Sequence, residues 1–536
     1  MSSPRPGTPK KKKKAQSEKS PKSLNKIPKI TSAPTPLRDT PLGGFLSPFT
    51  PSYIQWVARY VVLCFAVILR CAIGLGPYSG FQSEPMHGDF EAQRHWMEIT
   101  IHLPMSKWYF YDLQWWGLDY PPLTAYHSWF LGKIGSFFNP QWFALDTSRA
   151  LDDPDLKSYM RATVIASELA IYIPGVIWYV RWYGKNLGLS SIDQSIATAA
   201  VLLQPALMLV DHGHFQYNSV MLGLTLMAIV NLSTSPHRRL LASVLFVSAI
   251  LFKQMALYYA PAIFAYLLGV CVFPSINILR LISIGLVVIA SFAIALLPFF
   301  YSGGLDQLIQ IAIRVFPFER GLWEDKVANI WCTVNTFVKL REIFSLSQLQ
   351  QLALGATLAA IAPTMGLIFY YPRRHLLPWA FSAIAWAFFL FSFQVHEKSV
   401  LVPLMPATML LASSDPNTVA LVTWINNVAS FSLWPLLRRE GLGLQYAIMV
   451  FCWNWLLGNL SPSRISTILP KPLFWKLVVV GSYAAMILLH IGQEYVPAQY
   501  YIYRFPDIWV LGNVTLCTGC FGLFWLWTNY KLYTLR

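Results

Sequence analysis

Long apolar segments alternate with short polar segments along almost the whole chain of 536 residues. A helix needs about 20 mainly apolar residues to cross a bilayer, and counting such segments from Tyr53 onward predicts about 14 transmembrane helices. A shorter apolar segment, residues 120–138, begins close to two prolines and contains His127 and Lys133, so we predict that it forms a helix lying on the membrane surface. The pattern therefore predicts an all-α polytopic membrane protein.

The composition agrees with this class, because 55% of the residues are hydrophobic and only 12% are charged. Much of the formal net charge of +16 lies at the amino end, where the chain is rich in Lys, Pro and Ser. Such a segment cannot bury enough apolar surface to fold, so we predict a disordered basic arm over residues 1–48 and one membrane domain over residues 49–536. Beside a membrane helix, a lysine run is typical of a cytosolic topology signal or a contact with membrane lipids, and we expect no nucleic acid partner.

Basic residues mark the cytosolic ends of membrane helices, and applying this rule from the arm onward places both termini in the cytosol. Residues 75–158 and 302–349 then form two long loops on the opposite side, the first of them with surface helices. Arg438 and Arg439 are the one basic pair on the wrong side. The conspicuous clusters of mixed charge all fall at helix ends on the non-cytosolic side, which is how a site is assembled between the helices of a bundle.

The first of these clusters is the segment Gly88 to Trp96, which we expect to be a loop carrying Asp89, Glu91, Arg94 and His95. Charges in a loop are often merely solvated, but a carboxylate here can also deprotonate a hydroxyl nucleophile. Glycosyl transfer with inversion needs one such base, whereas retention needs a second carboxylate about 5 Å away as nucleophile. Asp119 is a second acidic candidate in the same loop.

The later clusters are basic or polar, and their cationic members are His212, His214, Lys253, Arg320, Lys326, His396 and Lys398. A phosphodiester leaving group gains negative charge as it departs, so cations beside it stabilise the transition state. Three other interpretations stay open. His212, His214 and Asp89 offer ligands to a metal, although no ligand spacing of known geometry is present. Lys253 can be a snorkelling helix-end lysine, and Asp211 can cap the next helix.

The chain contains no Walker sequence, Rossmann fingerprint or glycine-rich nucleotide loop. A sugar phosphate carried on a lipid, reaching a non-cytosolic acid from within the membrane, fits both this absence and the topology. A lipid or sugar transporter is the rival from another class. It is expected to show internal repeats and charged or broken segments at mid-membrane depth, whereas the chain shows no repeat and its clusters lie at one surface.

Four motifs together carry a resemblance to a known family: Gly88 to Glu98, Leu118 to Thr124, Asp211 to Asn218 and Val395 to Lys398. They resemble the dolichyl-phosphate-glucose glucosyltransferases of the endoplasmic reticulum, which have a GT-C fold and form glycosyltransferase family 57. The likeness runs from about residue 50 to the carboxyl end. It implies inverting transfer of glucose from dolichyl-phosphate glucose to a dolichyl-diphosphate oligosaccharide on the luminal side, by a multi-pass protein of the endoplasmic reticulum membrane.

By this resemblance Asp89 matches the catalytic acidic position and Asp119 the second acidic motif. One enzyme of the family adds the first glucose to Man(9)GlcNAc(2)-diphosphodolichol in α-1,3 linkage, and another adds the second. Lys253 to Met255 and Glu324 to Asn329 resemble the first enzyme. No cofactor, nucleotide or metal is expected, and we expect a monomer. The candidate substrate-binding residues are Glu91, Arg94, His95, Asp119, Tyr120, Asp211, His212, His214, Gln216, Tyr217, Asn218, Lys253, Gln254, Arg320, Lys326, Asn329, His396, Glu397 and Lys398.

Overall fold

The computed structural model describes residues 34–232, 235–316, 326–461, 469–500, 503 and 505–536. Within these ranges every regular element is a helix, which confirms the all-α prediction. Nine helices of the described chain are long and apolar enough to cross a membrane. A tenth crossing arises if α7 (Ser191–Leu202) and the segment Pro205–Phe215, which are bent by 48° at a short break, form one span.

The long helices follow the apolar segments predicted from the sequence. They are α2 (Gln55–Gly74), α5 with α6 (Pro154–Asn186), α11 with its preceding turn (Gln254–Val272), α12 (Ile278–Val315), α15 (Leu346–Tyr370), α16 with its preceding turn (Arg374–Phe391), α18 with α19 (Pro416–Arg439), α22 (Leu473–Tyr495) and α23 (Ile508–Thr534). The remaining predicted spans coincide with shorter helices, namely α9 (Asn218–Asn231), α10 (Pro236–Phe252), α17 (Leu401–Met409) and α20 (Gly443–Leu456). Because these are shorter than the ~20 residues of a straight crossing, the count of 14 stays a prediction.

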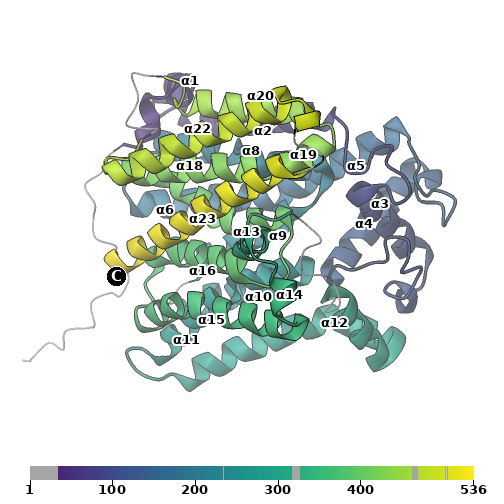
Figure 1. The fold of residues 1–536 in the computed structure, drawn as a ribbon. Coiled ribbons are helices and arrows are strands. Elements are labelled where there is room, and N and C mark those ends of the chain that lie inside the picture. Colours follow the sequence, from purple (N-terminus) through teal and green to yellow (C-terminus); the bar gives the residue numbers. More distant parts are fainter. Residues whose placement is uncertain (1–33, 233–234, 317–325, 462–468, 501–502, 504) are drawn as a thin grey trace, which may run out of the picture.

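Two helices between α2 and α5 lie at the end of the bundle opposite the carboxyl terminus (Figure 1). α4 (Pro122–Phe138) is the helix predicted at the membrane surface. α3 (Gly88–His102) corrects the prediction of a loop. Its sequence suits a helix, because two acidic residues in the first turn favour the positive end of the helix dipole and Arg94 lies three residues from Glu91 and four from Glu98, where ion pairs form.

Two boundaries differ from the sequence prediction. The basic arm was predicted to be disordered to residue 48, but α1 (Pro41–Leu46) and the short 3₁₀ helix Pro36–Asp39 precede that point. Leu37, Leu42 and Leu46 are buried, and Arg38 pairs with Asp193 of α7 at 3.0 Å, so this part packs on the bundle. Residues 1–33 lie outside the described chain. The second long loop was predicted from residue 302, but α12 continues to Val315 through a kink at Gly304 (φ 66°).

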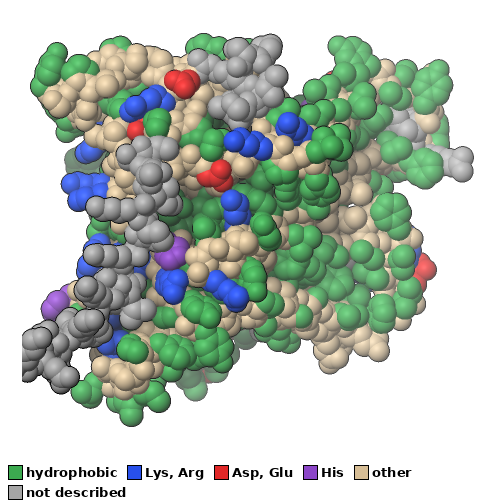
Figure 2. All heavy atoms as spheres, turned by 90° about the vertical axis from the view of Figure 1, so that its left-hand side faces the viewer, with side chains coloured by type: hydrophobic (Ala, Val, Ile, Leu, Met, Phe, Trp, Pro, Cys, Tyr) green, Lys and Arg blue, Asp and Glu red, His purple; other side chains and the backbone are tan. Residues whose placement is uncertain are grey.

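The predicted cytosolic turns come together at the carboxyl-terminal end of the bundle. Figure 2 shows this face, which carries many of the Lys and Arg side chains. Arg374 donates to the carbonyl of Val230 (2.8 Å), and the ring of His375 lies 3.1 Å from the carbonyl of Leu535. Near the same end Lys531 pairs with Asp415 at 3.3 Å. These contacts bring segments distant in sequence together at one end of the bundle, and that this end faces the cytosol stays a prediction.

This arrangement predicts the outcome of inserting glycosylation tags. A tag near Gln82 is expected to be glycosylated, and tags near Pro236 or Arg373 are expected to stay unmodified. Gln307 also lies in the second predicted luminal loop, but its side chain is buried against the Met105 carbonyl, so exposed Lys339 is the better position for a tag in that loop. A mobility shift after endoglycosidase treatment reads out each tag, and the reverse pattern would contradict the predicted topology.

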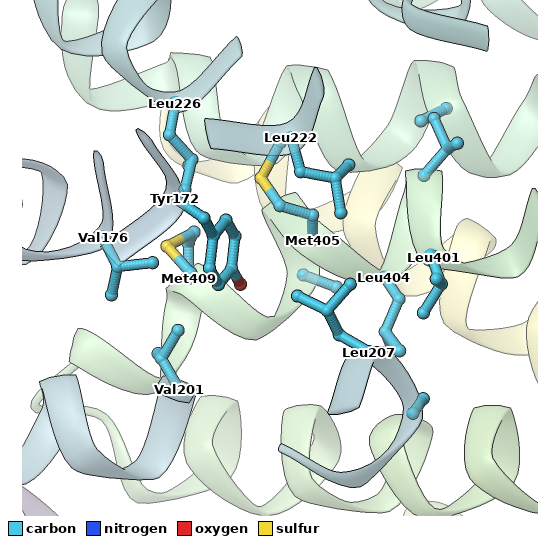
Figure 3. Close-up of a cluster of buried hydrophobic side chains, with 14 of the residues drawn as sticks. Tyr172, Val176, Val201, Leu207, Leu222, Leu226, Leu401, Leu404, Met405 and Met409 are labelled. Carbon is cyan, nitrogen blue, oxygen red and sulfur yellow. The ribbon is translucent and has the colours of Figure 1, made fainter. Parts of the chain in front are cut away.

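One part of the core gathers apolar side chains from five segments of the chain. Figure 3 shows this cluster, in which Tyr172 and Met409 lie close to one another. Its labelled members are Tyr172, Val176, Val201, Leu207, Leu222, Leu226, Leu401, Leu404, Met405 and Met409, and each is less than 10% exposed. These side chains hold α8 (Pro205–Met208), α9 and α17 together, and the polar segments that follow α8 and precede α17 therefore meet at one end.

Candidate active site

Asp89 stands at the start of α3, where the backbone takes a conformation that only glycine accepts easily. Gly88 has φ +67°, and a Cβ placed on it would lie 2.7 Å from the carbonyl carbon of Ser79. The close approach lets the Asp89 N–H donate to Ser79 Oγ (3.1 Å). The Ser79 N–H in turn donates to the carbonyl of His214 (2.9 Å). The first turn of α3 is thereby fixed against the segment that carries His214.

The segment Leu209–Phe215 is a buried π-helical turn that follows α8, a geometry often found at functional sites. Asp211 lies inside it and is fully buried. One Asp211 oxygen accepts from the Ser219 N–H (2.7 Å) and the other from Asn218 Nδ2 (2.8 Å). Asp211 therefore accepts a backbone hydrogen bond from the first turn of α9, as the capping interpretation proposed, and its other oxygen orients the Asn218 side chain.

Three side chains from two distant segments of the chain meet at the Asp89 carboxylate. Oδ2 of Asp89 lies 2.5 Å from Lys398 Nζ and 2.9 Å from His214 Nε2, and it accepts a hydrogen bond from Gln216 Nε2. Lys398 Nζ also lies 3.2 Å from His214 Nε2. The side chains of Asp89 and Lys398 are 21% and 23% exposed, whereas His214 is buried. The site thus consists of buried hydrogen-bond donors and, above them, a carboxylate–ammonium pair that is partly accessible to solvent.

The surroundings hold both members of that pair in their charged forms. Burial alone would raise the pKa of Asp89, but the Lys398 ammonium and the hydrogen bond with His214 outweigh burial and hold this pKa well below its usual range. Burial likewise opposes the charge of Lys398, yet the neighbouring Asp89 carboxylate raises the Lys398 pKa above its usual value. Asp89 is consequently an anion at neutral pH and is able to accept a proton.

Lys253 supports this centre from beneath. Its ammonium is buried and donates to Asn218 Oδ1 (2.6 Å) and Gln216 Oε1 (3.1 Å), and it lies 4.7 Å from the centroid of the Tyr120 ring. Because Lys253 occupies the oxygen of the Gln216 amide, the NH₂ group of that amide is turned toward Asp89. These contacts argue against the snorkelling interpretation, in which the ammonium would reach the surface.

His212 belongs to a different network from His214. Its Nε2 lies 2.5 Å from Glu168 Oε2, and Glu168 accepts two hydrogen bonds from Arg70 (2.6 and 2.7 Å). All three side chains are buried. The two histidines of the His-Gly-His motif thus face different carboxylates, and no group of three or more His, Cys, Asp or Glu suited to a metal ion occurs in the described chain. The expectation of metal-independent activity stays a prediction.

Glu91, Arg94 and His95 are not part of the Asp89 centre. The Arg94 guanidinium binds Glu91 Oε1 (2.6 Å), Glu98 Oε2 (2.7 Å) and Ser148 Oγ (2.6 Å), all of them buried. His95 Nδ1 lies 3.2 Å from Glu98. Burial opposes the Glu98 charge, but His95 and Arg94 lower the pKa of Glu98 to about 2. This network holds α3 against residues 142–148, and substrate binding by its members stays a prediction.

The other candidate residues are dispersed. Tyr217 is buried with its hydroxyl 2.7 Å from Thr163 Oγ1, Gln254 donates to the Val315 carbonyl (3.2 Å), and Asn329 caps α13 (Ile330–Phe337). Lys326 pairs with Asp507, and Glu397 lies 3.7 Å from Arg439. Asp119 and His396 are half-buried, and Arg320 lies outside the described residues. Sequence reasoning missed Glu440, which contacts His214, and the Glu168–Arg70 pair, because each depends on contacts between distant segments.

The long apolar helices define a polytopic membrane protein. At one end of the bundle a carboxylate is held among an ammonium, an imidazole and an amide, an arrangement suited to acid–base chemistry. The model of the ALG6, ALG8 glycosyltransferase family matches residues 66–529, and the chain belongs to this family.

Three relatives illustrate the similarity. The dolichyl pyrophosphate Man9GlcNAc2 alpha-1,3-glucosyltransferase of Saccharomyces cerevisiae is 52% identical over 523 residues, which cover 92% of this chain and 95% of the relative. The enzyme of the same name from Gallus gallus is 41% identical over 403 residues, covering 74% and 77%. A probable enzyme of this name from Arabidopsis thaliana is 38% identical over 484 residues, covering 88% and 89%.

Proposed function

We propose that this protein transfers glucose from dolichyl-phosphate glucose to Man(9)GlcNAc(2)-diphosphodolichol and forms an α-1,3 linkage during assembly of the N-glycan precursor in the endoplasmic reticulum. Membership of the ALG6, ALG8 family and similarity to enzymes named for this reaction support the proposal. The structural observation that carries it is the Asp89 carboxylate, which is partly exposed at one end of the bundle and lies 2.5 Å from the Lys398 ammonium and 2.9 Å from His214 Nε2. The site faces the lumen, and both termini are cytosolic.

Asp89 acts as the general base in this proposal. Its carboxylate takes the proton of the acceptor hydroxyl while the hydroxyl oxygen attacks the anomeric carbon, and the bond from that carbon to the donor phosphate oxygen breaks. One base suffices because the attack enters opposite the leaving group. An α-linked product then requires a β-linked donor. The paired cation Lys398 keeps Asp89 deprotonated before the acceptor arrives.

The leaving group is dolichyl phosphate, which gains negative charge as the bond breaks. Lys398 and the half-buried His396, two residues before it, border the phosphate in this proposal, since a partly exposed ammonium beside the base lies where that charge develops. Lys253 is a weaker candidate for this role because its ammonium is already bound to Gln216 and Asn218 beneath the site. Neither a nucleotide nor a metal is required.

A transfer assay with the purified full-length chain and defined lipids tests the function. Glucose is expected to pass from dolichyl-phosphate glucose to Man(9)GlcNAc(2)-diphosphodolichol, with no effect of EDTA. An acceptor that already carries one glucose is expected to react poorly. Preference for that acceptor would instead identify the second glucosyltransferase of the pathway. Lipid movement across vesicles without any sugar transfer would favour a transporter.

A further inference from the structure

A narrow groove lies between α2 and α6 (Ile173–Asn186), both of which pack on α7. Its lining side chains come from these three helices. The groove lies away from the Asp89 centre. Arg59, which lines it, is separated by about 21 Å of helix from Ile73. Ile73 packs at the other end of α2 on Gly213, where an added Cβ would lie 3.6 Å from Ile73 Cγ2.

The two ends of the groove differ in chemistry. Arg59 of α2 and Arg181 of α6 lie at one end, together with Gln194 from the first turn of α7. About 12 Å farther along α6 and α7, the lining changes to Ile173 and Leu202. The groove is therefore cationic at one end and apolar at the other, which is the polarity of a single lipid molecule with a charged headgroup.

The part of the groove between these ends suits a hydrocarbon chain. Val62 and Ile177 contribute apolar side chains from α2 and α6. Ser195 and Thr198 of α7 also line this part, but their hydroxyls donate to carbonyls four residues earlier in the same helix, at 3.1 and 2.7 Å. Because these hydroxyls already have acceptors, an apolar chain beside them leaves no polar group without a partner.

Both arginines at the cationic end are exposed, and within the described part of the chain neither has an acidic partner. Asp193 at the start of α7 is close in sequence to the groove but is already bound to Arg38 at 3.0 Å. An anion at this end of the groove therefore meets two positive charges that no described carboxylate offsets.

We propose that this groove binds one anionic phospholipid, with its phosphate between Arg59 and Arg181 and an acyl chain along the apolar lining. Arginine is well suited to phosphate because its planar guanidinium offers paired donors. The guanidinium of Arg374 lies 4.7 Å from the ring centroid of Trp182, which places the cationic end beside the basic turns predicted to face the cytosol. Basic pockets between membrane helices on that side are typical sites for anionic headgroups.

Two other occupants fit the charges less well. In the proposed function the phosphates of both dolichyl lipids lie at the Asp89 end, so neither lipid supplies a headgroup to this end of the groove. The lysine-rich residues 10–14 carry the same charge as the two arginines and are repelled by them. A phospholipid of the surrounding membrane is thus the occupant that the groove favours.

Native mass spectrometry of the full-length protein, titrated with phosphatidylserine, tests the proposal. One phosphatidylserine is expected to bind in preference to phosphatidylcholine. Arg59→Gln combined with Arg181→Gln is expected to lower the affinity for phosphatidylserine about 10- to 30-fold, because two cationic contacts to the headgroup are lost. The matched control is Arg373→Gln combined with Arg536→Gln, which removes two arginines outside the groove and is expected to bind normally.

A further variant tests the acyl chain independently of charge. Leu63 is half-buried and lines the groove, so Leu63→Trp is expected to weaken phosphatidylserine binding while both arginines remain. Unchanged melting temperatures in phosphatidylcholine vesicles show that the variants are folded. Wild-type affinity in both the double arginine variant and Leu63→Trp would overturn the proposal, as would an equal loss in the matched control. Competition by inorganic phosphate as strong as that by phosphatidylserine would reduce the groove to a simple anion site and also overturn it.

Discussion

Replacing Asp89 by Asn is expected to lower glucose transfer about 100- to 10,000-fold, the usual contribution of a general base. The amide has nearly the size of the carboxylate and still offers an oxygen to Gln216 and Lys398, so the fold and the binding of both lipids are expected to persist. What the amide lacks is the basicity that accepts the hydroxyl proton. Transfer under saturating donor, together with the melting temperature of the purified variant, measures the two effects separately.

Two neighbouring carboxylates serve as comparisons for this variant. Glu91→Gln is expected to act chiefly on stability, because Glu91 is bound to buried Arg94 and lies away from the Asp89 centre. Asp119→Asn is the more demanding comparison, since Asp119 is half-buried in the same loop and matches the second acidic motif. A loss at Asp119 equal to that at Asp89 would leave the choice of base open, and near-normal transfer by Asp89→Asn would remove Asp89 from the mechanism.

Replacing Lys398 by Met is expected to reduce kcat/KM about 30- to 1,000-fold, because one cationic contact to the departing phosphate is lost. The pH profile is expected to change as well. Lys398 lowers the pKa of Asp89, so its removal raises that pKa, and Asp89 becomes protonated at higher pH than in the native protein. The acidic limb of the kcat/KM profile should therefore move to higher pH.

The control for this variant is Lys133→Met, which removes an exposed ammonium from α4 at the same end of the bundle. It should leave both the rate and the pH profile unchanged. His396→Ala is expected to weaken transfer without moving the acidic limb, since the charge facing Asp89 is retained. If Lys398→Met kept a normal rate and a normal profile, the donor phosphate would have to bind elsewhere, with Lys253 as the next candidate.

The alternation of long apolar segments with short polar ones predicted most of the fold, because a membrane helix is defined by its own composition. Each predicted span has a helical counterpart, and α4 is a helix as predicted, while its place on the membrane surface stays a prediction. The prediction of a loop at α3 was wrong because the local helix signals in this segment were given too little weight. The spacing of Glu91, Arg94 and Glu98 is that of ion pairs along a helix, and it already implied that these residues share a face turned away from Asp89.

The composition of the site was harder to predict because its contacts join distant segments. His214 and Lys398 lie 125 and 309 residues beyond Asp89 in the chain, and no spacing rule connects them. Only the predicted topology indicated that these residues could meet, because it placed their clusters on one side of the membrane. Arg438 and Arg439, the one basic pair that broke the rule of positive cytosolic loops, also lie near the site. Both arginines pair with carboxylates, Glu494 at 3.1 Å and Glu397 at 3.7 Å, and they stand directly before Glu440.

The measurement that tests the central claim most directly is a structure of the Asp89→Asn variant with dolichyl-phosphate glucose and the Man(9)GlcNAc(2) acceptor both bound. Because this variant binds but does not transfer, the two lipids should be trapped in place. We expect the attacking hydroxyl within hydrogen-bond distance of the side chain at position 89, in line with the anomeric carbon, and the donor phosphate beside Lys398. A hydroxyl bound to Asp119 instead, with the side chain at position 89 remote from both sugars, would contradict the account.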